Sequence, residues 1–104
     1  MSTKRRASEF LVELDGTLTF GAALAALRET EEESLAAFAK RLRVSRQHLC
    51  DIEQGRKVVS AERAARFARA LKQPEAAFVK LALDDTLRAA KLKYAVELHA
   101  LAAR

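Results

Sequence analysis

Four hydroxyl side chains divide the middle of this chain into segments of helical period. Thr19, Ser34, Ser45 and Ser60 each stand directly before a run whose apolar residues recur every three or four positions. A hydroxyl in this place caps the free amide groups at the start of a helix. The 104 residues include only three glycines and one proline, so few positions interrupt these helices. The pattern predicts a mainly α-helical chain.

Five helices are expected between Thr19 and about residue 83. The third ends at Gly55, a typical C-terminal stop, and Pro74 opens the fifth, since proline is favoured in a first helical turn. The faces expected to form a common core are Phe20, Ala23, Leu24 and Leu27, then Leu35, Phe38, Ala39 and Leu42, then Leu49 and Ile52, then Ala64, Phe67, Ala68 and Leu71, and finally Phe78, Leu81 and Ala82.

The two ends of the chain carry shorter patterns. Phe10–Leu14 is a brief apolar stretch closed by the turn signal Asp15-Gly16, which predicts an arm with a short strand. In the tail, the apolar residues fit a helical stripe and also alternate as in a half-buried strand. The alternation favours a strand at 92–99, with the Phe10–Leu14 arm or the same strand of a second subunit as its partner.

The expected organisation is therefore an N-terminal arm at 1–18, one helical domain at 19–83, and a C-terminal extension at 84–104. The extension, strand or helix, is the segment in which we expect a dimerisation contact. A chain of this length has room for one domain and short attachments to it.

Composition excludes several classes of function. Cys50 is the only cysteine, and with two distant histidines it provides neither a disulfide nor a metal site. No apolar run approaches the roughly 18 residues that span a bilayer, and the basic N-terminus lacks a secretory signal. A cytoplasmic protein of bacterial type, associated with the nucleoid and without a membrane partner, is expected. No catalytic grouping or phosphate loop indicates an enzyme, and no cofactor is implied.

Positive charge is concentrated in the middle of the chain. Residues 34–72 contain ten lysines and arginines against three acidic residues, whereas residues 9–33 contain seven acidic residues against Arg28. A surface that meets phosphate groups has this character, so double-stranded DNA is the expected partner. Charge alone fits a solvated basic face equally well.

The segment 38–55 is the most informative. It contains two short capped helices joined by a tight turn, with the small residue Ala39 where the helices must approach closely. This arrangement is typical of a helix-turn-helix, whose second helix enters the major groove of DNA and reaches base edges with the residues near its start.

From Phe20 to about Leu71 the chain resembles the Cro/C1-type helix-turn-helix family, also called the XRE family. The matching positions run in register without a gap and are Phe20-Gly21, Leu24, Leu27-Arg28, Phe38-Ala39, Leu42, Val44-Ser45, Leu49, Ile52-Glu53, Gly55, Ser60, Phe67-Ala68 and Ala70-Leu71. The resemblance implies a five-helix lambda-repressor-like domain that binds palindromic DNA as a homodimer. It also implies an ion pair between Arg28 and Glu53 that orients the recognition helix.

Three positions depart from the family pattern. Leu35 replaces the usual glutamine that braces the recognition helix, and Arg43 replaces the usual glycine of the turn, so it must adopt a left-handed conformation or modify the turn. Glu32 and Glu33 replace Gly-Leu before the second helix. Their carboxylates favour the helix dipole and repel phosphates nearby.

The expected reading residues lie at the start of the third helix. Arg46 suits guanine and Gln47 suits adenine, His48 follows them, and Asp51 one turn on suits the amino group of cytosine. The residues expected to contact the DNA backbone are Ser45, Lys40, Arg43, Arg56 and Lys57. Arg63, Arg66 and Arg69 recur every three residues and are interpreted as the solvent face of the fourth helix. Cys50 is interpreted as a packing residue rather than a redox switch.

The function predicted is sequence-specific binding of double-stranded DNA by a transcriptional regulator, a repressor acting as a homodimer through the helix at about 45–54. One alternative is an antitoxin that binds a cognate toxin protein through its tail and represses its own operon. Another is a protein-interaction module whose DNA face has decayed, which Leu35 and the Glu31–Glu33 cluster would explain.

Overall fold

A computed structural model describes residues 18–102 and contains five helices and no strand within them. The helices are α2 (Phe20–Thr30), α3 (Leu35–Leu42), α4 (Arg46–Glu53), α5 (Ala61–Leu71) and α6 (Glu75–Ala89). The predicted mainly α-helical, five-helix fold is confirmed. Apart from residue 18, the predicted arm, including Phe10–Leu14, lies outside the described residues.

The four predicted helix caps are all formed. Thr19, Ser34, Ser45 and Ser60 have extended backbone, and each hydroxyl accepts a hydrogen bond from the amide three residues further on. The bond from the His48 amide to the Ser45 hydroxyl, for example, measures 2.9 Å. Pro74 takes the corresponding place before α6 and makes no side-chain cap.

All five helices of residues 18–102 end in the same left-handed turn. The residue in the left-handed conformation is Glu32, Arg43, Gly55, Lys72 or Lys91 in turn. After α3, the Arg43 amide donates to the Lys40 carbonyl at 3.2 Å and the Val44 amide to the Ala39 carbonyl at 3.1 Å. This pattern satisfies helix carbonyls that would otherwise lack donors. Only one of the five turns uses the glycine that the conformation favours.

The core is built from the predicted faces of all five helices. Three phenylalanines occupy its centre: the rings of Phe20 and Phe78 lie 5.4 Å apart, edge to face, and Phe20 and Phe67 lie 6.3 Å apart. Leu24, Leu49 and Ile52 are also fully buried. Leu35 and Leu81, which we expected to face inward, are only partly buried and pack at the edge of the core.

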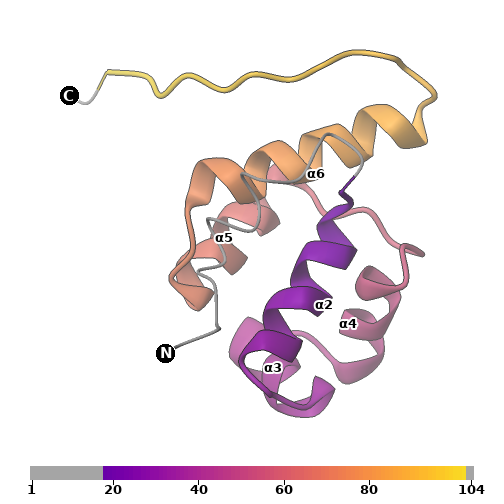
Figure 1. The fold of residues 1–104 in the computed structure, drawn as a ribbon, viewed down its shortest axis with the longest axis vertical. Helices are drawn as coiled ribbons and strands as arrows, with labels where there is room; N and C mark the ends of the chain where they lie inside the picture. Colours follow the sequence, from indigo (N-terminus) through magenta and orange to yellow (C-terminus); the bar gives the residue numbers. More distant parts are fainter. Residues whose placement is uncertain (1–17, 103–104) are drawn as a thin grey trace, which may run out of the picture.

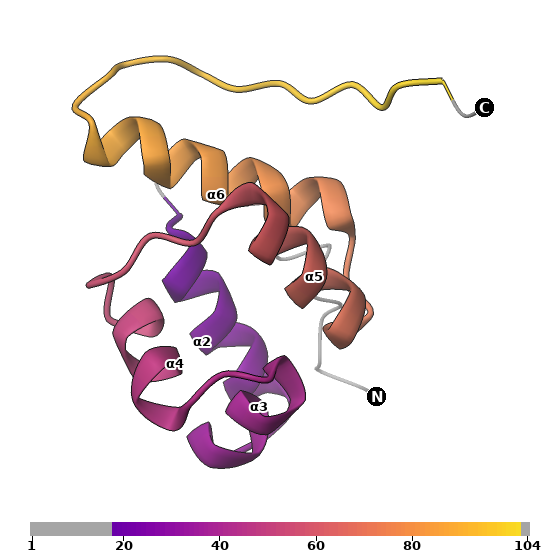
Figure 2. The same cartoon turned by 180° about the vertical axis from the view of Figure 1, so that it is seen from behind.

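The helices form two groups (Figure 1). Helices α5 and α6 pack against each other, and α3 and α4 lie at the end of the molecule farthest from α6, with α2 between them. Figure 2 shows the same arrangement from behind. The side chain of Asp85 in α6 accepts a hydrogen bond of 3.0 Å from the Phe20 amide at the start of α2. This bond ties the two groups together.

The C-terminal segment differs from the expectation. Helix α6 continues to Ala89, through the boundary that we predicted at 83/84. Residues 92–102 then form neither a helix nor a strand, so the strand favoured at 92–99 is wrong for the single chain. A strand needs a neighbour for its backbone groups, and in Figures 1 and 2 this segment runs back above α6 as an unpaired extended chain.

Candidate nucleic-acid interface

A three-residue turn, 43–45, joins α3 to α4. Arg43 has φ 61° and ψ 43°, so the turn has the left-handed geometry usual for glycine and is not modified. Two residues later Ser45 caps α4. The chain therefore reverses direction within one turn, and α4 begins directly with the residues predicted to read bases.

The inner face of α4 is fixed by close packing. Leu49 and Ile52 are buried, and Gly21 of α2 lies against the backbone of α4. A Cβ atom at Gly21 would stand 2.0 Å from the Ile52 carbonyl oxygen, a distance that no real contact allows. We had placed the close approach of helices at Ala39; the structure adds a second one at Gly21, for which a glycine in a first helical turn with no turn to make is the available signal.

The ion pair between Arg28 and Glu53 is formed. The Arg28 guanidinium donates from Nε to Glu53 Oε2 at 2.9 Å and from Nη2 to Oε1 at 3.0 Å, while Nη1 donates to the Glu33 carbonyl at 3.1 Å. The Glu53 side chain is only 5% exposed, and its hydrogen bonds raise the pKa of Arg28. One guanidinium thus connects α2, the last turn of α4 and the approach to α3.

The outer face of α4 carries a hydrogen-bonded group. Gln47 Nε2 donates to Asp51 Oδ1 at 3.0 Å, and Arg56 Nε donates to the same oxygen at 2.9 Å. The hydrogen bond from Arg56, followed by that from Gln47, lowers the pKa of Asp51. Arg46 is exposed and has no partner among residues 18–102. The structure therefore brings two predicted base-reading residues together with a predicted backbone contact.

His48 connects α4 to α5. Arg63 Nη1 lies 3.1 Å from His48 Nε2. Because a guanidinium only donates, the ring nitrogen accepts, and Nδ1 carries the proton. We had interpreted Arg63 as part of a solvent face. The sequence holds no sign of this contact, since it depends on how α5 crosses α4.

The departures from the family pattern have physical explanations. Leu35 packs against the hydrophobic core instead of bracing α4. Arg41 forms ion pairs with Glu31, at 2.9 Å, and with Glu33, so a guanidinium counters two carboxylates of the acidic cluster. That same guanidinium lies over the Phe38 ring, 5.6 Å from its centre. The electrostatic repulsion that we expected from this cluster is thereby reduced.

The remaining predicted backbone contacts lie around α4. Lys40, Arg43, Ser45 and Lys57 are all exposed. Cys50 is half-buried, and its sulfur lies 3.7 Å from an Arg56 nitrogen. Among the described residues, no group of histidine, cysteine and acidic side chains is arranged to hold a metal ion. No helix between residues 18 and 102 has the length and apolar character needed to cross a membrane.

Two short helices in this relation, the second with a buried back and an exposed polar front, define a helix-turn-helix protein. A family model described as a helix-turn-helix domain matches residues 19–81, and the chain belongs to that family, in agreement with the resemblance to Cro/C1-type proteins. No curated protein and no solved structure shows significant similarity to the chain. Domains of this class bind DNA and are typically not enzymes.

Proposed function

We propose that this protein binds double-stranded DNA sequence-specifically and regulates transcription, as a homodimeric repressor whose helix α4 enters the major groove. One observation carries the proposal. The back of α4 is fixed by Gly21 and by the Arg28–Glu53 pair, while the residues of its first turn remain exposed on the front. A rigid element that presents polar side chains is what base reading requires.

The roles of the reading residues follow from their free hydrogen-bonding groups. Arg46 is unpaired and suits the O6 and N7 atoms of guanine. Gln47 already donates to Asp51, so its carbonyl oxygen and second N–H are left for an adenine. Asp51 retains Oδ2 to accept from cytosine N4. His48, with its proton on Nδ1, contributes a donor.

The backbone contacts surround this group. Arg43 and Lys40 lie at the end of α3, Ser45 starts α4, and Lys57 follows it. Arg56 orients Asp51 first, and its remaining N–H groups serve the phosphates. These charges position the protein on DNA without conferring sequence preference.

Homodimerisation makes the proposed specificity physically reasonable, because one helix-turn-helix buries too little surface for strong discrimination. We assign the DNA-binding unit to 19–83 and the dimer contact to the arm 1–18 and the extension 84–104. Within the extension, Tyr94 is 72% exposed and Leu101 94% exposed. Apolar side chains presented to solvent in this way favour a protein partner.

Selection from a random duplex library tests the proposal. Purified protein at moderate salt should enrich an inverted repeat with half-sites about one helical turn apart. The variant Arg46→Ala should then lose about 1–3 kcal/mol of binding free energy, concentrated at one base position. An equal loss on all sequences would make Arg46 a phosphate contact. A pool that stays random, with retention that disappears as salt is added, would contradict sequence-specific binding.

The exposed tail also supports a second candidate function, that of an antitoxin. Its apolar residues would then bind a toxin rather than a second copy. Co-expression with the product of the adjacent gene distinguishes the two. A stoichiometric complex that forms with the full chain, is lost on removal of residues 92–104, and neutralises that product would favour the antitoxin. A tail-dependent homodimer that ignores the product would favour the regulator.

A further inference from the structure

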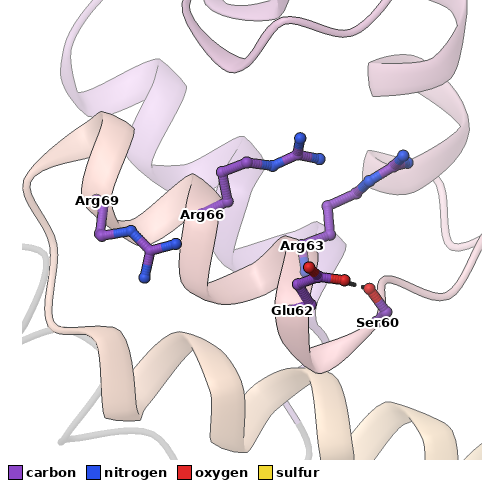
Figure 3. A pocket seen from close by; sticks show the side chains of 5 residues that line it. All are labelled: Ser60, Glu62, Arg63, Arg66 and Arg69. Carbon is purple, nitrogen blue, oxygen red and sulfur yellow. Dashed lines mark hydrogen bonds between the residues drawn. The ribbon is translucent and has the colours of Figure 1, made fainter.

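A basic pocket lies along α5, outside the group of residues just assigned to reading. Its volume is about 230 Å³, and it is lined by Ser60, Glu62, Arg63, Arg66 and Arg69. Figure 3 shows Arg63 and Arg66 extending from the same side of α5, with Arg69 one turn further along. Three guanidinium groups therefore surround one concave surface.

The three arginines differ in how far they are already occupied. Arg69 forms an ion pair of 2.8 Å with Glu75. Arg63 shares one nitrogen with His48. Arg66 is exposed and has no partner among the described residues. Glu62 is the single carboxylate of the lining, so the pocket has an excess of positive charge and free N–H donors.

The contact between Arg63 and His48 sets the location of this pocket. Because His48 belongs to the first turns of α4, the pocket adjoins the face that we propose enters the groove. A phosphodiester of the same DNA, next to the bases that α4 reaches, comes within range of the pocket. Guanidinium groups suit such a group, since their N–H donors match two oxygens at once.

We propose that the α5 pocket binds a backbone phosphate of the duplex, with Arg66 as its principal ligand and Arg63 as a link to the recognition helix. This inference rests on the proposed DNA binding. It extends the contacting surface from α4 and its flanking turns to the middle of α5. The fourth helix is then part of the interface and not only a support for it.

The first test uses inorganic phosphate and does not depend on DNA binding. In a titration of the full chain followed by NMR, the side-chain Nε–H signals of Arg63 and Arg66 should shift together and saturate. The shifts should disappear in Arg66→Gln. Equal, unsaturated shifts at Arg46 and Arg66 would show general ionic attraction, and the pocket would not be a site.

The second test measures duplex affinity against salt concentration, with the selected operator and a scrambled sequence. Arg66→Gln should lower affinity for both about five- to tenfold at low salt, and should reduce the slope of log K against log salt by about 0.9. Glu62→Gln should raise affinity for both, because it removes the carboxylate of the pocket. Lys93→Gln, which removes one positive charge from the tail, is the control.

The outcomes separate this inference from the proposed function. If the wild-type protein prefers its operator and Arg66→Gln matches Lys93→Gln in affinity and slope, the pocket does not contact DNA, although sequence reading stands. If no sequence is preferred but Arg66→Gln still lowers the slope, the pocket is supported while sequence-specific reading fails. If no duplex binds at all, both are overturned.

Discussion

The recognition helix α4 and the tail at 92–102 differ in the opposite way from what their sequences suggest. Helix α4 has only eight residues, too few to be stable alone, and most of its residues are polar. The tail has a regular alternation of apolar residues, yet it forms no secondary structure. Helix α4 is ordered because α2 and α3 offer surfaces that fit it. A pattern of apolar residues produces structure only where a complementary surface meets it.

The substitution Gly21→Ala would break this comparison most severely. The new methyl group would meet the Ile52 carbonyl at 2.0 Å, so α2 and α4 would have to separate, at a cost of about 3 kcal/mol. Urea unfolding measures the loss. The control is Gly55→Ala, which has φ +80° and open space around it and should cost about 1 kcal/mol. Equal losses would contradict the close approach.

Removing the carboxylate of Glu53 should have the next largest effect. The variant Glu53→Gln leaves a partly buried guanidinium without its counter-charge, which should destabilise the fold by about 2 kcal/mol. Glu75→Gln breaks an exposed pair, with side chains 63% and 56% exposed, and should cost less than about 0.5 kcal/mol. If the two variants unfold at the same urea concentration, the Arg28–Glu53 pair does not fix α4.

Arg43→Gly should sharpen the comparison by separating stability from binding. Relief of the left-handed conformation should raise the free energy of unfolding by about 0.5 kcal/mol, since glycine also makes the unfolded chain more flexible. DNA affinity should fall, because a proposed phosphate contact is lost. Lys72→Gly relieves the same conformation after α5 and should stabilise the fold without weakening DNA binding. A loss of stability in both variants would contradict the strain argument.

Removal of residues 92–104 should have the smallest effect on the folded domain. The described part of this segment is almost entirely exposed, so the free energy of unfolding of the single chain should change by less than about 0.5 kcal/mol. Sedimentation of the full and truncated chains at several concentrations reports the dimer separately. A loss above 1 kcal/mol that is independent of concentration would mean that the tail packs on its own domain.

Most of the fold could be predicted because its signals are local. The caps at Thr19, Ser34, Ser45 and Ser60 and the helical stripes behind them need no knowledge of distant residues. The tail was harder, since its residues fit two periods and its structure depends on a partner. Local signals define a helix, whereas a strand depends on a neighbour elsewhere in the chain or in another chain.

The candidate site was predictable in composition but not in connectivity. The start of α4 and the Arg28–Glu53 pair followed from a resemblance to known proteins. The bonds from Gln47 and Arg56 to Asp51 and the contact between Arg63 and His48 did not. They depend on side-chain direction and on the crossing of helices, and neither is written in residue spacing.

The shared oxygen of Asp51 has a consequence for how such a protein could acquire a new target. Two donors, Gln47 and Arg56, meet at that atom, so replacing any of the three releases the other two. Their effects on base preference should therefore be strongly non-additive. A change of target would then proceed through substitutions inherited together, and single replacements would more often abolish recognition than redirect it.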